Sequence, residues 1–160
     1  MEDIWNITAL VVSVLSVLLS LYALRQATTK NTSDMYLFFI SQYAKEDMKL
    51  ALRKLKDIKR GVYRLEQWES DMKNNLPKAF EYDEARRLVK YFYDTLAYMK
   101  LEKLIEARFV RLICLKKGAW LYLDTVEAIE KFFDSGYDKK PYAVIRDVCE
   151  NLRKEGCCPP

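Results

Sequence analysis

An uncharged stretch of 21 residues, from Ile4 to Leu24, constrains this chain more than any other feature of its sequence. As an α-helix it would be about 31 Å long, which matches the hydrocarbon core of a bilayer. Trp5 and Tyr22 stand near its two ends, where amphipathic rings favour the headgroup level. The sequence therefore predicts one N-terminal transmembrane helix within residues 1–27.

A cleaved signal peptide is the alternative for this stretch. Such peptides begin with positive residues and end with small residues at the cleavage site. Here the chain begins with Glu2 and Asp3, and bulky Leu24 and charged Arg25 stand at the exit, so an uncleaved anchor is favoured. Lysine and arginine lie only on the C-terminal side. The positive-inside rule then predicts an N-terminus outside the cell membrane and a cytoplasmic C-terminal domain.

Small residues recur along one side of this predicted helix, three or four positions apart. They are Ala9, Ser13, Ser16, Ser20 and Ala23. In lipid, helices associate by close approach at small residues and by serine hydrogen bonds. The stripe therefore predicts a contact with another copy of the chain or with a different membrane protein. The alternative is that the serines bond back to their own helix and face lipid.

The rest of the sequence predicts an all-α fold, with the anchor followed by a small cytoplasmic bundle of about six to seven helices. Proline and glycine number four each, which is few for a turn-rich β fold, and apolar residues recur at helical spacing. We expect a short linker at 28–33, a helical domain at 34–155 and a tail at 156–160. The expected helices cover about 34–43, 45–60, 64–74, 83–102, 106–115, 119–133 and 141–154.

Two of these helix boundaries carry further expectations. Residues 116–118 (Lys-Lys-Gly) resemble a helix C-terminus, where basic residues and glycine are favoured. Acidic residues cluster near the expected start of the helix at 83–102, where they would favour the helix dipole rather than form a catalytic carboxylate pair. They are Glu81, Asp83 and Glu84.

A stripe of basic residues runs along one face of the expected helix at 45–60. Its members are Lys45, Lys49, Arg53, Lys56 and Arg60. One interpretation is a solvated helix face. Another is a contact with anionic lipid or an acidic partner, because the stripe follows the predicted membrane exit closely. Nucleic acid is the least favoured partner, since no aromatic or polar base-reading residues are interleaved with the basic ones.

The chain resembles a family of uncharacterised prokaryotic membrane-anchored helical proteins, a domain of unknown function. The likeness lies in the N-terminal anchor and in two later segments, YAKEDMKLALRKLKDI and DEARRLVKYFYDTLAYMKLEKLIEARFV. It covers most of Tyr36 to Lys154 at the level of pattern. The resemblance implies a helical cytosolic domain without a known activity, so it transfers no functional residues.

The chain has no histidine, which is the commonest general base and metal ligand in proteins. No phosphate-binding loop or catalytic constellation is visible either. We therefore predict a protein without enzymatic activity, metal or cofactor.

The four cysteines are the remaining candidates for chemistry. Cys114 and Cys149 stand among apolar residues and are expected in the core. Cys157 and Cys158 follow Gly156 in a tail that is expected to be exposed, so they are candidate redox thiols. An inert tail is the favoured interpretation, and thiolate ligands for a metal are the third.

Together these features predict a membrane-anchored, non-enzymatic accessory or regulatory subunit that docks on a larger membrane protein complex. Its partner would be a membrane protein subunit, contacted through the transmembrane helix and the cytoplasmic domain. One alternative is a cysteine-based regulator of such a complex that responds to oxygen or redox state. A second is a self-associating scaffold on the lipid surface.

Overall fold

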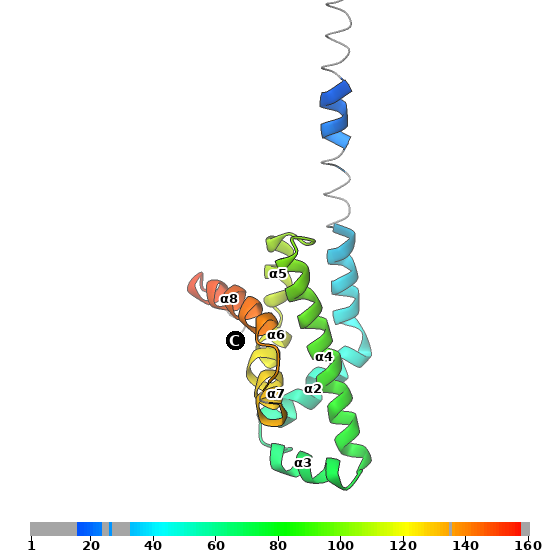
Figure 1. Ribbon diagram of the computed structural model, residues 1–160, viewed down its shortest axis with the longest axis vertical. Helices are drawn as coiled ribbons and strands as arrows, with labels where there is room; N and C mark the ends of the chain where they lie inside the picture. Colours follow the sequence, from blue (N-terminus) through cyan, green and yellow to red (C-terminus); the bar gives the residue numbers. More distant parts are fainter. Residues whose placement is uncertain (1–15, 24–25, 27–32, 135, 158–160) are drawn as a thin grey trace, which may run out of the picture. The chain divides into compact units, whose positions relative to one another are not determined.

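The computed structural model describes residues 16–23, 26, 33–134 and 136–157 (Figure 1). Every regular element within these ranges is a helix, so the predicted all-α class is confirmed.

The first of two compact units, Met1–Leu37, contains helical turns at 16–23 and 33–37. Apolar side chains in the earlier of these turns are exposed, for example Leu19. Among the described residues, none of the helices is long and apolar enough to span a membrane. Most of the predicted transmembrane stretch, residues 4–15 and Leu24, lies outside the described residues, so the anchor remains a prediction.

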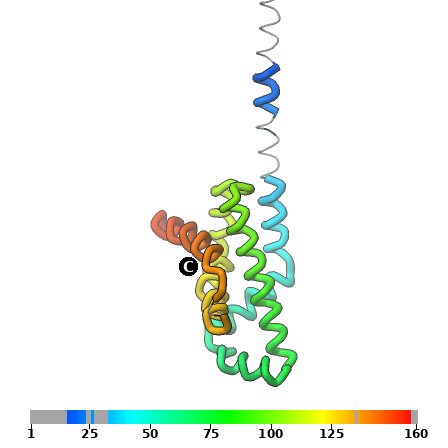
Figure 2. The backbone as a smooth tube through the Cα atoms, in the orientation of Figure 1, coloured from blue at the N-terminus to red at the C-terminus, as the bar shows by residue number. Residues whose placement is uncertain are grey.

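The second unit, Phe38–Pro160, is a helical bundle that opens with the rest of a helix covering residues 33–44. The elements that follow are α2 (Glu46–Lys59), α3 (Leu65–Lys73), α4 (Pro77–Leu101), α5 (Ala107–Cys114), α6 (Lys117–Leu121), the π-helical turn η1 (Tyr122–Val126), α7 (Glu127–Phe133) and α8 (Lys140–Lys154). The smooth trace of Figure 2 shows α6, η1 and α7 as one continuous run.

Helix α4 is the longest helix in the described part of the chain, and it organises the core of the second unit. It contacts α2, α3, α5, η1 and α8. Val89, Tyr93 and Leu96 are completely buried on its inner side, and the ring of Phe92 meets that of Phe39 with their centroids 5.4 Å apart. Each large apolar side chain removed from water in this way contributes about 1.5–3 kcal/mol.

Helix α4 begins at Pro77, earlier than the predicted start at Asp83. Leu76 is extended, with ψ 133°, and proline suits the first helical position because its missing N–H would have no partner there. Glu81, Asp83 and Glu84 therefore lie inside the helix. The prediction that they favour the dipole at its start is wrong.

Gly118 lies inside α6 rather than at the end of the preceding helix, so that prediction is also wrong. The break falls at Lys116, whose backbone is extended with ψ 144°. The glycine is explained by packing. A Cβ atom at Gly118 would lie 2.7 Å from the hydroxyl oxygen of Tyr93 and 3.0 Å from the ring of Tyr43.

Candidate functional site

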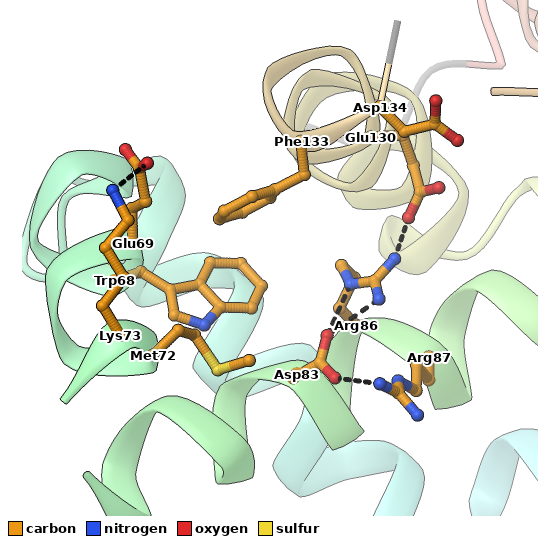
Figure 3. A pocket seen from close by; sticks show the side chains of 10 residues that line it. All are labelled: Trp68, Glu69, Met72, Lys73, Asp83, Arg86, Arg87, Glu130, Phe133 and Asp134. Atoms are coloured by element: carbon orange, nitrogen blue, oxygen red, sulfur yellow. Dashed lines mark hydrogen bonds and ion pairs between the residues drawn. The ribbon is translucent and has the colours of Figure 1, made fainter. Parts of the chain in front are cut away.

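An open cleft of about 550 Å³ lies between α3, α4 and the end of α7 (Figure 3). One wall is apolar, because Trp68 and Met72 of α3 face Phe133 of α7. The opposite side is charged and comes mainly from α4. The lining residues are Trp68, Glu69, Met72, Lys73, Asp83, Arg86, Arg87, Glu130, Phe133 and Asp134.

A buried ion-pair network forms the charged side of this cleft. Arg86 donates from Nε and Nη2 to one carboxylate oxygen of Asp83, at 3.0 and 2.8 Å, and from Nη1 to Glu130. The other oxygen of Asp83 accepts from Arg87 at 2.7 Å. Burial alone would lower the pKa of the Arg86 guanidinium, but the bonds to Asp83 and Glu130 outweigh it and raise that pKa.

The apolar wall holds a polar atom without a partner. Trp68 is buried, and its indole Nε1 has no hydrogen-bond acceptor among the described residues. Its ring meets that of the exposed Phe133 edge-on, with centroids 5.4 Å apart. In Figure 3 the indole lies between Phe133 and Met72, and the Arg86 network lies across the cleft. A buried donor left unpaired costs free energy.

Glu127, one turn before Glu130 on α7, is the centre of a second buried network. It accepts from the Tyr137 hydroxyl at 3.0 Å and from the guanidinium of Arg146, and it pairs with Lys131 at 3.2 Å. Burial raises the pKa of Tyr137, and the bond to Glu127 adds to the effect. Both α7 carboxylates are therefore held by basic partners, which suits structural roles better than proton transfer.

Three buried tyrosines form a stacked column in the core of the second unit. The ring centroids of Tyr93 and Tyr122 are 5.1 Å apart, and those of Tyr122 and Tyr142 are 4.5 Å apart. Tyr122 donates its hydroxyl hydrogen to Asp94, whereas the hydroxyls of Tyr93 and Tyr142 have no partner in the described part of the chain. Burial raises the pKa of all three phenols.

The predicted core cysteines, Cys114 of α5 and Cys149 of α8, are both buried free thiols. They also form a pair across the α5–α8 interface, which the sequence did not reveal. Their mutual hydrogen bond, together with burial, raises the pKa of Cys114. Both thiols are buried among apolar side chains, so we interpret the pair as part of the core.

The tail thiols are described only in part. Cys157 is exposed and free, with its sulfur 3.8 Å from the carbonyl oxygen of Glu155. Cys158 lies outside the described residues. The redox prediction for these two residues is untested.

The predicted basic face is exposed at all five positions, Lys45, Lys49, Arg53, Lys56 and Arg60. Within the described ranges, Lys49 is the one member with an ion pair, to Glu46 at 3.2 Å. Neighbouring lysines of α2 point instead to other helices: Lys54 pairs with Glu81 at 2.8 Å, and Lys59 pairs with Asp124 at 2.6 Å.

The predicted membrane contact stripe is also described in part. Ala9 and Ser13 lie outside the described residues, while Ser16, Ser20 and Ala23 are helical and exposed. The hydroxyl of Ser20 donates to the backbone carbonyl of Ser16 at 2.9 Å, as the alternative interpretation expects. This hydrogen bond does not test the predicted contact with another membrane helix.

Sequence reasoning did not identify the cleft, because its residues come from three separate helices. The one signal available was the spacing of Asp83, Arg86 and Arg87, which places opposite charges one turn apart on one helix. No three cysteine, aspartate or glutamate side chains of the described part converge on a point that could hold a metal ion.

Comparison with known proteins finds no match to this chain among protein-family models, curated proteins or solved structures. The resemblance to a family of membrane-anchored helical proteins therefore remains a prediction. What the fold and the site define, over the described residues, is an all-helical domain that carries an amphipathic cleft.

Proposed function

We propose that this chain is a membrane-anchored, non-enzymatic accessory or regulatory subunit that docks on a larger membrane protein complex. The observation that carries the proposal is the cleft between α3, α4 and α7. It combines an exposed aromatic ring with a charged side whose buried groups are already paired. Such a surface is better suited to binding a protein segment than to catalysing a reaction.

The tether in this proposal is the N-terminal stretch from Ile4 to Leu24, with the helical domain held in the cytoplasm. Its support is the absence of charge over 21 residues and the basic residues that follow. Membranes from cells that express the full chain, washed in alkaline carbonate, should retain it in the pellet. Release into the supernatant would refute the tether.

The occupant we assign to the cleft is an apolar helix face of a membrane-protein partner. Phe133 is exposed, and Phe132, next to it, is exposed as well, with ring centroids 5.0 Å apart. Trp68, which is buried, supports the ring of Phe133 from within the domain. Burying aromatic anchors of this kind against a partner supplies most of the energy of a typical interface.

Photo-crosslinking in native membranes tests this docking site. A benzoylphenylalanine in place of Phe133 should yield a covalent adduct with one defined membrane protein. The same probe in place of Tyr91, an exposed aromatic of α4 that does not line the cleft, is the matched control. Equal labelling from both positions would argue against a specific cleft interface.

The redox-responsive alternative is favoured by one observation, the exposure of Cys157. It predicts that oxidants change which proteins co-purify with the chain. Replacing Cys157 and Cys158 together by serine should abolish that change, and an undiminished response in the double variant would eliminate the alternative.

A further inference from the structure

Four helices of the second unit, α2, α3, α4 and α8, end in the same backbone turn. In each turn an N–H group donates across five residues to a carbonyl oxygen at 2.9 Å. The pairs are Val62 to Asp57, Leu76 to Asp71, Leu104 to Met99 and Cys157 to Leu152. This pattern is the Schellman motif, in which the residue before the donor adopts a left-handed conformation.

The left-handed residue differs among the four turns. It is Gly61 after α2 and Gly156 after α8, with φ 72° and 75°, and Asn75 after α3, with φ 53°. After α4 it is Lys103, with φ 57°. Glycine has no Cβ to clash and asparagine tolerates this region, but lysine adopts it at a cost in free energy. A strained lysine where the same chain elsewhere uses glycine indicates a use for its side chain.

Exposed leucines flank this lysine. Leu101 is 47% exposed and Leu104 is 57% exposed, although both are large apolar residues. Lys103 has no ion pair within 4.0 Å among the described residues. The turn therefore presents two apolar side chains around one unpaired ammonium group.

The other charges of the turn are largely neutralised. Glu106 pairs with Arg108 at 2.6 Å, and Lys100 pairs with Asp147 at 3.6 Å. Glu102, at the end of α4, is the remaining acid and is exposed. Lys103 is thus the free cation of the turn in the described part of the chain.

The α4–α5 turn lies at the same end of the second unit as the helix by which the chain enters that unit. Figure 1 shows the turn and the helix that enters the unit at Phe38 at one end, and α3 at the other. Helix α4 joins these two ends and has 25 residues, about 37 Å. Thirteen residues lie between Leu24 and Phe38, a reach of at most about 50 Å when fully extended. Within the second unit, the chain therefore enters at the end that carries Lys103.

We propose that the α4–α5 turn rests on the bilayer that holds the N-terminal stretch, with Leu101 and Leu104 at the boundary between headgroups and acyl chains and the Lys103 ammonium on a lipid phosphate. This inference rests on the proposed membrane tether. Lysine at such a boundary extends its ammonium to the headgroups while its stem stays in apolar surroundings, and leucines bury their surface in the same layer.

A fluorescence experiment on the full-length chain in lipid nanodiscs tests the contact. An environment-sensitive fluorophore is attached at Leu104→Cys in a background of Cys157→Ser and Cys158→Ser. Leu76→Cys is the matched control, because Leu76 holds the same position in the turn after α3, at the far end of the unit, and is 44% exposed. Spin-labelled lipids then quench any probe at the membrane surface.

We expect several-fold stronger quenching at Leu104→Cys than at Leu76→Cys. Adding Lys103→Gly should weaken the binding of the turn about fivefold in discs that contain phosphatidylserine, a loss equal to one lysine–headgroup contact. This substitution relieves the left-handed strain, so misfolding would not explain the loss. A thermal unfolding curve of the variant checks that point.

Equal quenching at both positions, in chains that have entered the discs, overturns the inference and leaves the tether intact. Chains that fail to enter the discs overturn the tether and the inference together. Quenching at Leu104→Cys that ignores Lys103→Gly and lipid charge overturns the phosphate contact of Lys103.

Discussion

Arg86 of α4 donates a hydrogen bond to Glu130 of α7 and so joins the two helices on the charged side of the cleft. The same guanidinium binds Asp83, one turn earlier on α4. One cation therefore neutralises two buried carboxylates from two helices and holds the charged side of the cleft in place.

Removing Arg86 should be far more damaging than removing its neighbour. Arg86→Met leaves Asp83 and Glu130 buried without their main partner, and we expect a loss of about 3 kcal/mol in the free energy of unfolding. The side chain of Arg86 is 18% exposed and that of Arg87 is 71% exposed. Arg87→Met should therefore cost at most about 1 kcal/mol. Urea denaturation of both variants measures the difference, and comparable losses would contradict the network described.

Two tyrosines of the stacked column should respond oppositely to loss of the hydroxyl group. Tyr122→Phe removes the donor to Asp94 and should destabilise the fold by about 1–2 kcal/mol. Tyr93→Phe removes a buried hydroxyl without a partner in the described chain, so it should be neutral or slightly stabilising. Thermal and urea unfolding of the two variants provide the test. A large loss in Tyr93→Phe would reveal a partner for that hydroxyl.

Because Gly118 lies close to Tyr93, a substitution at Gly118 should destabilise the fold, and a second substitution at Tyr93 should restore part of the lost stability. Gly118→Ala places a methyl group 2.7 Å from the Tyr93 hydroxyl oxygen. We expect a loss of about 1–3 kcal/mol, which exceeds the gain in helix propensity of about 1 kcal/mol. Tyr93→Phe removes the oxygen and should restore part of the loss. Strict additivity in the double-mutant cycle would show that the two sites are independent.

Some parts of this fold could be predicted from the sequence and others could not. The apolar face of α8, which includes Tyr142, Ile145 and Leu152, follows from helical spacing, and these residues are buried. Local periodicity reports such a face because one helix supplies all of it. Local periodicity gave the wrong prediction at Gly118. The glycine there is needed because Tyr43 and Tyr93, which are far away in sequence, pack against it.

The cleft was beyond sequence reasoning for the same physical reason. Asp83 and Glu130 become partners of one arginine only after α4 and α7 have packed together, and no local pattern encodes that packing. Helical spacing alone can place Trp68 on the inner face of its helix. Its unpaired nitrogen and its neighbour Phe133 depend on the tertiary structure.

Alkaline pH should unfold this protein progressively. Burial raises the pKa values of Tyr93, Tyr122 and Tyr142, so the folded state keeps these phenols protonated. In the unfolded chain they ionise near pH 10. The stabilisation is therefore complete below about pH 9 and decreases as pH rises past about 10, by about 1.4 kcal/mol per pH unit for each such tyrosine. Urea midpoints across this range measure it, and Tyr93→Phe with Tyr142→Phe should give a shallower decline. A pH-independent midpoint would contradict the burial of these phenols.

The most direct test of the account is purification of the full chain from its native membrane in mild detergent. We predict that one membrane protein co-purifies with the wild-type chain and with Tyr91→Ser in fixed ratio, and that Phe133→Ser lowers its recovery about tenfold, the loss expected from removing one aromatic anchor. Recovery of the wild-type chain alone, or of the same partner in undiminished amount with Phe133→Ser, would contradict the account.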